Sequence, residues 1–317
     1  MPLFGAHMSV AGGLWRAVEH ARAVGAQALQ VFTANQRRWE APRLSDSDAE
    51  RFRAAVAEWG GGFVASHASY LFNLASPDEE AGLRSAHGLA AEIGRCALLG
   101  IPWVVLHPGA HLEGGSGGRP VASDSGGRFV ENGVRRVAAR LATAFDAADR
   151  LHPQAGGVGV LLENTAGQGT CLGADVAELG RIVDACPARE RLGVCIDTAH
   201  ACAAGYDLAT REGYARLVGE VDRAVGLGRV RLFHVNDSAT PCGARSDRHA
   251  HIGLGHVGAA GFARLVRDPR FAGHPMVLET HKGKDLAEDR RNLRVLRRLA
   301  SGDDPAEAAR DVDGLGE

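Results

Sequence analysis

Short apolar runs alternate with longer amphipathic segments along almost the whole chain of 317 residues. This alternation restricts the fold more than any other feature of the sequence, because it predicts repeated strand–helix units. Eight of the runs have the length and the aliphatic composition of buried strands. The expected strands are Leu3–Val10, Ala28–Thr33, Phe63–His67, Trp103–His107, Val158–Glu163, Leu192–Asp197, Val230–Val235 and Pro275–Glu279.

Each expected strand is followed by a segment with helical periodicity. The expected helices are Leu14–Val24, Asp46–Trp59, Gly82–Leu99, Val130–Ala148, Ala174–Ala185, Arg211–Val225, Ala259–Val266 and Leu286–Ala300. Eight such units match an α/β fold, the (β/α)8 or TIM barrel. A doubly wound open sheet usually has fewer strands and a glycine-rich phosphate loop, whereas only Gly12 and Gly13 follow the first run here. We therefore predict a single-domain TIM barrel over residues 1–300.

Two segments depart from the alternation. Residues 113–128 contain six glycines, and we expect an inserted, mobile loop after the fourth strand. Residues 301–317 are acidic and poor in large apolar side chains, so a disordered tail is expected there.

The charge balance argues against a nucleic-acid partner when it is taken alone. The formal net charge is −2, whereas phosphate binding normally leaves a basic footprint. No apolar run reaches the roughly 18 residues of a membrane helix, so no membrane partner is expected. The six cysteines form no C-x-x-C pair and no secretory leader is evident, which favours reduced thiols and a cytoplasmic location.

Polar side chains gather where the expected strands end. In a TIM barrel the carboxyl ends of all strands converge on one face, where catalytic groups lie. A single histidine beside an apolar run is more often a hydrogen-bonded core residue than a ligand, but six consecutive strands end in this way. The candidate metal ligands are His67, His107, Glu163, Asp197, His200, His234, Asp247, His249 and Glu279. Histidine mixed with carboxylates and without cysteine is typical of zinc or manganese hydrolytic sites, and nine ligands suit two or three ions.

The motifs that contain these residues resemble the endonuclease IV family of abasic-site DNA repair nucleases. The resemblance runs from Gly5-Ala6-His7 to Glu279 and is specific because the motifs occur together and in order. The matching strings are His67-Ala68-Ser69-Tyr70, His107-Pro108-Gly109-Ala110-His111, Glu163-Asn164-Thr165-Ala166-Gly167-Gln168-Gly169, Asp197-Thr198-Ala199-His200, His234-Val235-Asn236-Asp237, Asp247-Arg248-His249 and Leu278-Glu279-Thr280.

The resemblance implies three zinc ions per chain, with manganese as an alternative in part of the site. His67, His107 and Glu163 would hold the first ion. Glu163 would bridge to a second ion held by Asp197, His234 and Glu279, and His200, Asp247 and His249 would hold the third. A hydroxide between the first two ions would attack the phosphorus, and the third ion would stabilise the leaving 3′ oxygen. Glu163 is the expected catalytic carboxylate, because it positions that hydroxide.

The implied substrate is duplex DNA with an abasic site, cut on its 5′ side to leave a 3′-hydroxyl and a 5′-deoxyribose phosphate. A missing base lowers the cost of extruding the nucleotide, so selectivity can come from shape. The family's DNA-contacting positions match Asn35, Gln36, Arg37, Tyr70 and Leu71. From the residues alone, packing of Tyr70 and Leu71 beneath the rim is an equal alternative. Arg248 is a candidate phosphate clamp, and His7 a candidate support beside the ligands.

Two other functions compete with this interpretation. A metal-dependent sugar isomerase or epimerase on the same barrel would also gather Glu, Asp and His at strand ends, but it needs only one or two metals. A non-catalytic metal-binding or DNA-damage-binding protein would not need all nine ligand positions intact. A self-contained barrel that cuts DNA needs no second subunit, so a monomer is expected.

Overall fold

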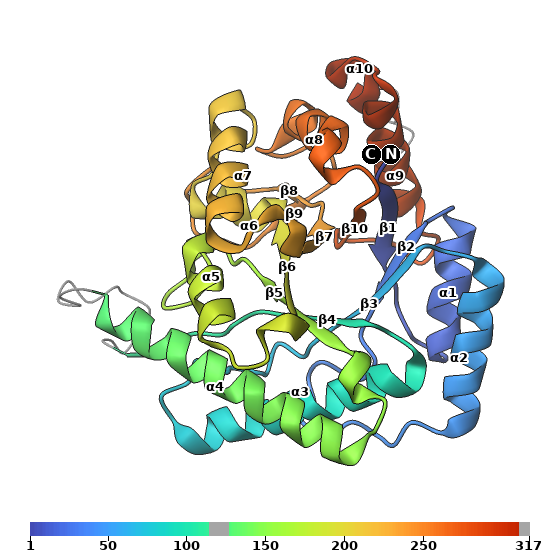
Figure 1. The fold of residues 1–317 in the computed structure, drawn as a ribbon. Helices are drawn as coiled ribbons and strands as arrows, with labels where there is room; N and C mark the ends of the chain where they lie inside the picture. The colour runs from blue at the N-terminus through green and yellow to red at the C-terminus, as the bar shows by residue number, and fades with distance from the viewer. Residues whose placement is uncertain (114–126, 311–317) are drawn as a thin grey trace.

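A closed barrel of eight parallel strands forms the centre of the computed structural model, which describes residues 1–113 and 127–310. Around the barrel the strands follow the order β1-β10-β7-β6-β5-β4-β3-β2, so each strand is hydrogen-bonded to its neighbours in the chain's βα sequence. The helices form a ring outside the strands (Figure 1). The predicted TIM barrel is therefore confirmed.

Each of the eight barrel strands lies within one of the eight expected runs. Their bounds are β1 (Leu3–His7), β2 (Ala28–Val31), β3 (Phe63–His67), β4 (Trp103–Leu106), β5 (Gly159–Glu163), β6 (Leu192–Asp197), β7 (Val230–His234) and β10 (Pro275–Leu278). A separate antiparallel ribbon of β8 (Asp237–Ser238) and β9 (His249–Ala250) follows β7. The periodicity did not predict this ribbon, because each of its strands has only two residues.

The described ranges contain ten α-helices, of which eight have bounds close to those expected, whereas α6 and α10 are not predicted by the periodicity. The ten helices are α1 (Leu14–Ala23), α2 (Asp46–Trp59), α3 (Glu79–Leu99), α4 (Arg128–Leu151), α5 (Val176–Ala185), α6 (Thr198–Ala204), α7 (Arg211–Val225), α8 (Gly258–Arg267), α9 (Ala287–Ser301) and α10 (Pro305–Arg310). Side-chain oxygens of Ser45, Asp78, Asp175, Asp197 and Thr210 accept a backbone N–H at the starts of α2, α3, α5, α6 and α7. These caps satisfy donors that a helix cannot satisfy internally, which is why the helices begin at these residues.

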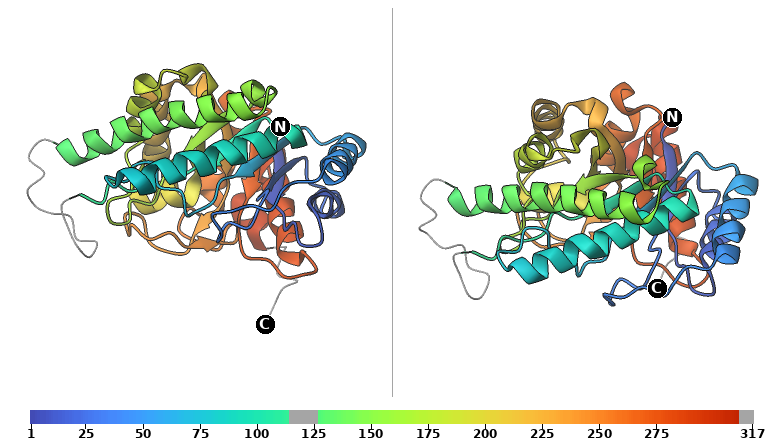
Figure 2. Two further views of the ribbon diagram at one scale, coloured as in Figure 1. Left: turned by 90° about the horizontal axis from the view of Figure 1, so that it is seen from below. Right: turned by 60° about the horizontal axis from the view of Figure 1, so that its bottom comes forward.

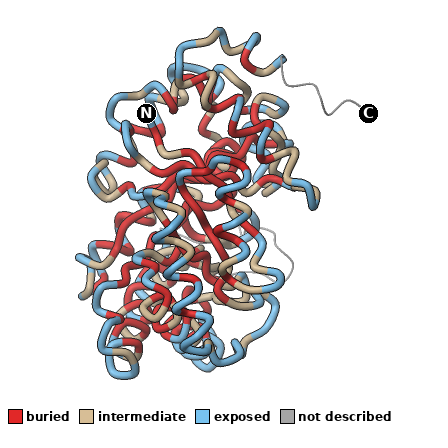
Figure 3. Tube along the Cα trace, turned by 90° about the vertical axis from the view of Figure 1, so that its right-hand side faces the viewer, coloured by how far each residue is buried: buried red, intermediate tan, exposed pale blue. Residues whose placement is uncertain are grey.

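The barrel interior is filled by small and aliphatic side chains. One residue from each of seven strands forms a compact layer, namely Ala28, Ala65, Val105, Leu161, Cys195, Leu232 and Val277. A larger apolar layer lies between the strands and the helices. Buried residues concentrate in the interior of the molecule, and exposed segments lie at the periphery (Figure 3). The closed core leaves only the rim loops and strand ends free to build a site.

The contact between β1 and β2 requires a glycine at position 5. A Cβ atom there would lie 1.8 Å from the carbonyl oxygen of Ala28. The absence of a side chain therefore allows the two strands to approach closely and keeps His7 beside the end of β2.

Two boundary predictions need correction. Residues 301–317 were expected to be a disordered tail, but residues 305–310 form α10, which packs against α8 and α9 and buries Ala308 completely. A single buried alanine in an acidic segment is too weak a sequence signal to predict this helix. Residues 311–317 lie outside the described residues.

The predicted inserted loop is only partly described. Residues 114–126 lie outside the described ranges, whereas Arg128, which was assigned to the loop, is the first residue of α4. Helices α3 and α4, which flank this connection, lie side by side (Figure 2). Among the described residues, no helix is long and apolar enough to cross a membrane.

Candidate metal centre

The carboxyl ends of six neighbouring strands supply most of the predicted ligands. His67, Glu163, Asp197 and His234 are the last residues of β3, β5, β6 and β7, and His107 and Glu279 come directly after β4 and β10. His200 lies in α6. Asp247 lies in the loop between β8 and β9, and His249 is the first residue of β9. Barrel closure thus brings together residues that are up to 212 positions apart, from His67 to Glu279.

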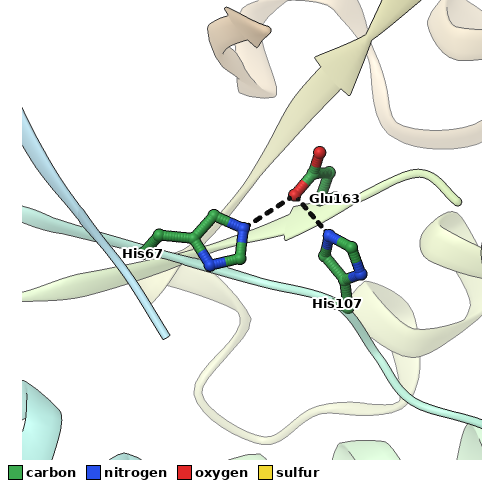
Figure 4. A group of neighbouring side chains, drawn as sticks. All are labelled: His67, His107 and Glu163. Carbon is green, nitrogen blue, oxygen red and sulfur yellow. Dashed lines mark hydrogen bonds and ion pairs between the residues drawn. The ribbon is translucent and has the colours of Figure 1, made fainter. Parts of the chain in front are cut away.

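Glu163 lies at the centre of the first group. Its Oε2 atom is 3.2 Å from His67 Nε2 and 2.9 Å from His107 Nε2, and the three side chains point toward one another from adjacent strands (Figure 4). Ligand atoms of these residues lie within 4.8 Å of one another. The arrangement offers two imidazole nitrogens and one carboxylate oxygen to a single cation.

The other oxygen of Glu163 faces a second group. Its Oε1 atom is 2.8 Å from His234 Nδ1, and Glu279 Oε2 lies 3.1 Å from the same nitrogen. Asp197 completes this group. Because its two oxygens face different groups, Glu163 has the geometry of a bridging carboxylate.

Asp197 also joins the second group to the third. Its Oδ1 atom accepts a 2.7 Å hydrogen bond from the backbone of His200 at the start of α6, and its Oδ2 atom lies 3.8 Å from His249 Nε2. The third group consists of Asp197, His200 and His249. The family resemblance implies Asp247 in this set in place of Asp197. Asp247 is close as well, since its oxygens lie 3.3 Å from His200 Nε2 and 3.2 Å from His249 Nε2.

The hydrogen bonds of the histidines suit a metal site. Nδ1 of His67, His200 and His249 lies 2.8, 2.9 and 3.3 Å from the backbone carbonyl oxygens of Ala68, Asn164 and Glu279. A carbonyl oxygen can only accept, so each Nδ1 carries a proton and each Nε2 is available to a ligand. This second contact, which fixes the tautomer, is usual for metal-binding histidines.

One ligand atom lacks a hydrogen bond. His249 Nε2 is buried and forms no hydrogen bond with any residue in the two described ranges, although it faces Asp247. A buried polar nitrogen without a hydrogen bond is costly. A cation between His249, His200 and the two carboxylates would satisfy it, so the donor set fits a metal.

Charge dominates the electrostatics of the cluster. Burial alone would raise the pKa of Glu163, but the charges of His234 and His107 hold that pKa well below its usual range. Burial alone would lower the pKa of His249, but the Asp247 and Asp197 carboxylates raise it to about 9. Without a metal, the ionised carboxylates therefore pair with protonated histidine rings. A bound cation would take the place of the ring protons.

Three polar residues outside the predicted site contact the predicted ligands. Asn164 Oδ1 accepts the backbone N–H of Asp197 at 2.7 Å, and Asn236 Nδ2 donates to Asp197 Oδ2 at 2.6 Å. Asn236 Oδ1 accepts the backbone N–H of Glu279 at 2.7 Å. Gln30, on β2, contacts His234, Glu279 and His7. The two asparagines directly follow expected strands and stand inside the matching motifs, and these two signals could have identified them.

The predicted DNA-contacting residues lie on neighbouring rim loops. The Ser69 hydroxyl donates to the carbonyl oxygen of Gln36 at 2.8 Å, which joins the loop after β2 to the loop after β3. Asn35 and Arg37 are exposed on the first loop, and Tyr70 is 61% exposed on the second. Leu71 is half-buried. The alternative that Tyr70 packs beneath the rim is therefore wrong.

Arg248 and His7 occupy different positions relative to the cluster. Arg248 is exposed, and its guanidinium donates to the carbonyl oxygen of Asp247 at 2.8 Å. His7 Nδ1 lies 3.4 Å from Glu279 Oε1, and burial lowers the pKa of His7. His7 therefore lies beside one of the predicted ligands, and its role as a support remains a prediction.

Comparison with known proteins first defines the class. Residues 18–299 match the family described as the xylose isomerase-like TIM barrel. The 3-keto-D-glucoside 4-epimerase YcjR of E. coli has the same fold, with a TM-score of 0.64 and 15% identity over 94% of this chain and 99% of that one.

Closer relatives define the family within this class. A probable endonuclease 4 of Nitratidesulfovibrio vulgaris strain Hildenborough is 50% identical over 300 residues, which cover 95% of this chain and 99% of the relative. A probable endonuclease 4 of Chloroflexus aurantiacus is 46% identical, with the same coverage. The crystal structure of endonuclease IV from Thermus thermophilus has a TM-score of 0.79 and 38% identity over 95% of this chain and 100% of that chain. The chain belongs to the endonuclease IV family, as its motifs predicted.

Proposed function

We propose that this protein hydrolyses the phosphodiester bond on the 5′ side of an abasic nucleotide in duplex DNA, leaving a 3′-hydroxyl and a 5′-deoxyribose phosphate. Membership of the endonuclease IV family makes it a DNA-cleaving hydrolase. The observation that supports the reaction best is the cluster of His, Asp and Glu side chains that converge at one rim of the barrel.

We propose three zinc ions as the cofactor, with manganese as an alternative in part of the site. His67, His107 and Glu163 would hold one ion, and Glu163, Asp197, His234 and Glu279 a second. His200, His249 and Asp247 would hold the third, with Asp197 beside them. Bound ions would activate water and stabilise the charge that develops on the leaving oxygen.

The protein's own residues would fix this geometry. Glu163 cannot turn away, because it is completely buried and both of its oxygens are held by rings. Thr198 Oγ donates to the carbonyl oxygen of Asn236 at 2.6 Å, which ties α6 to the end of β7. Such preorganisation keeps the ligands from rearranging as charge develops on the phosphate.

A cavity beside the first group would receive the damaged nucleotide. It has a volume of about 220 Å³, and its lining includes His67, Tyr70, Asn73 and His107. Pockets for drug-sized ligands are usually about 300–1,000 Å³, so this cavity suits a sugar without its base. Arg37, Tyr70 and Leu71 would fill the gap in the duplex, and Asn35, Gln36 and Arg248 would contact the backbone.

A sugar epimerase is the alternative that the shared barrel suggests, but only the fold supports it. Such an enzyme needs one or two metals, so His200, His249 and Asp247 would have no role. The monomeric state and the cytoplasmic location remain predictions from the sequence.

The test combines metal analysis with a cleavage assay. The zinc content of the purified protein is measured, and the protein is then incubated with a duplex that carries one tetrahydrofuran abasic analogue. We expect close to three zinc ions per chain and a cut only on the 5′ side of the analogue. Fewer than two ions, or an uncut analogue, would overturn the proposal, and turnover of a ketohexose would favour the epimerase.

A further inference from the structure

Gln30 is a completely buried amide at the barrel mouth, in a strand that supplies none of the predicted ligands. Its side chain contacts three other side chains at the mouth of the barrel. Its Nε2 atom lies 2.5 Å from Glu279 Oε1 and 3.0 Å from His7 Nδ1, and its Oε1 atom lies 2.8 Å from His234 Nε2.

The chemistry of these partners fixes the orientation of the amide. An ionised carboxylate only accepts hydrogen bonds, and a carboxylate that holds a cation is ionised, as Glu279 would be in the group with Glu163, Asp197 and His234. The amide nitrogen must therefore face Glu279, which leaves the amide oxygen facing His234. An amide oxygen only accepts, so His234 Nε2 must carry a proton and donate it.

This proton makes His234 different from three other rings of the cluster. His67, His200 and His249 donate Nδ1–H to backbone carbonyls and present Nε2 to the site. His234 donates Nε2–H to a side chain and presents Nδ1, which lies 2.8 Å from Glu163 and 3.1 Å from Glu279. A backbone acceptor is part of the fold, whereas the acceptor for His234 depends on one side chain.

We infer that Gln30 is a positioning residue for one metal position, because it selects the Nδ1-binding tautomer of His234 and orients Glu279 at the same time. The inference rests on the proposed metal site but not on the DNA reaction. Gln30 contacts ligands of the group formed by Glu163, Asp197, His234 and Glu279. Loss of the Gln30 amide should therefore weaken the binding of one ion and leave the other two bound.

Two variants separate the roles of the amide. Gln30→Met keeps the length of the side chain but removes all three hydrogen bonds. Gln30→Glu keeps an acceptor for His234 but replaces the donor to Glu279 with a second carboxylate. Gln27→Met is the matched control, because Gln27 is exposed and lies one residue before β2.

The first measurement is the tautomer of His234 in the zinc-loaded wild-type protein, obtained from long-range nitrogen–proton NMR correlations of ¹⁵N-histidine. We expect the proton of His234 on Nε2 and those of His67, His200 and His249 on Nδ1. A proton on Nδ1 of His234 would overturn the inference, and this result does not depend on whether any variant folds.

The second measurement is zinc retention under competition with a chelator. Loss of a group that supports a ligand typically weakens metal binding by about 10–100-fold. We expect Gln30→Met to lose one ion at a chelator concentration at which the wild type and Gln27→Met keep all theirs, and Gln30→Glu to lose the same ion. If Gln30→Met retains zinc as the wild type does, or if Gln30→Glu does, the role assigned to the amide is wrong.

Both readouts are independent of cleavage, so the two proposals can fail separately. A protein with the expected tautomer and selective zinc loss that leaves abasic DNA uncut would contradict the proposed function alone. If the wild type cuts abasic DNA, and Gln30→Met cuts it as fast and binds zinc as tightly, only this inference is contradicted.

Discussion

Glu163 is completely buried, yet both of its oxygens face histidine rings. Glu163→Gln replaces one oxygen with an amide that can only donate on that side, so the bridge between two metal positions is lost. We expect incision to fall by roughly 10³-fold, which corresponds to about 4 kcal/mol of lost metal-ion catalysis. The measurements are the incision rate and the zinc content.

The control for this variant is Glu190→Gln, the same chemical change at an exposed position. It should leave both the rate and the zinc content unchanged. A Glu163→Gln protein that is folded, by circular dichroism, and still cuts at the wild-type rate would exclude the bridging role.

Tyr70 is the most exposed aromatic candidate at the rim, and its ring lies 5.3 Å from that of His67. Tyr70→Ala should weaken binding to abasic duplex by about 10–100-fold, because an aromatic ring that stacks on a base contributes about 1–3 kcal/mol. Zinc content should not change. Binding is measured by fluorescence anisotropy, with Leu151→Ala as the control.

Leu151 is a suitable control because it is 71% exposed at the far end of α4. Equal losses of affinity in the two variants, or no loss in Tyr70→Ala, would count against a role for Tyr70 in DNA contact.

The sequence made some residues of the site predictable and others not. His67 and Glu163 were identified because each interrupts an apolar run at its carboxyl end. Gln30 lies inside such a run, between Leu29 and Val31, where a polar residue has no positional signal. Its role depends on contacts with residues 204 and 249 positions away, and only barrel closure creates these contacts.

At the scale of elements, Asp237 holds the loop that follows the β8–β9 ribbon. Its two oxygens accept backbone N–H bonds of 2.8–3.2 Å from Ser238, Gly253, Gly255, Val257 and Gly258. In Asp237→Asn, the amide NH2 group would replace one accepting oxygen, so it would face N–H groups that then have no acceptor. Because a buried donor without a partner costs about 1–3 kcal/mol, we expect the free energy of unfolding to fall by about 2–4 kcal/mol.

Urea denaturation of the zinc-loaded protein measures this loss. Asp222→Asn is the control, because Asp222 is exposed and its side chain accepts one backbone N–H, from Leu227 at 3.2 Å. A loss no larger than that of the control would show that the loop does not depend on Asp237.

Glu92 links α3 to the rim loop after β2 and gives the fold a pH dependence. Burial raises the pKa of Glu92, although hydrogen bonds from Ser66 and Thr33 and the charge of Arg95 oppose the shift. A carboxyl whose pKa is raised in the folded state stabilises the protein below its unfolded pKa of about 4.5. This stabilisation is lost as the pH rises through the folded value.

Glu92→Gln removes this titration. We therefore expect the stability of the variant relative to the wild type to increase as the pH rises from about 4 through the raised pKa of Glu92, and then to level off. Denaturation at several pH values measures the difference between the two proteins. A difference that is constant with pH would mean that the pKa of Glu92 is not raised.

Elements were predictable where a long periodic pattern existed. The predicted and observed bounds of α2 and α7 are identical. Helix α6 has only seven residues, which is too short for a periodic pattern. It begins at the cap formed by Asp197. The Asp197–His200 spacing indicates a single turn but does not show that the helix cap and the predicted metal ligand are the same side chain.

For the whole molecule, net charge was a misleading guide to partners. The chain carries a formal charge of −2, but four of its carboxylates, Glu163, Asp197, Asp247 and Glu279, converge at one rim. Without metal only the protons of the neighbouring histidine rings offset these carboxylates at the place where a phosphate must bind. Three divalent cations would add six positive charges there, so the local potential of the loaded site would differ in sign from that of the carboxylates alone.

DNA binding should therefore depend on both metal and salt. We expect removal of zinc with a chelator to weaken binding to abasic duplex by at least about 10-fold, and the affinity of the loaded protein to fall steeply with salt, since each neutralised phosphate contributes about −0.9 to the logarithmic slope. Anisotropy titrations of loaded, stripped and zinc-restored protein at two salt concentrations measure both effects. If restored zinc does not recover the affinity, the loss came from damage to the chain. Equal affinities of stripped and loaded protein would mean that exposed rim residues such as Arg37 and Arg248 bind DNA without help from the metal centre.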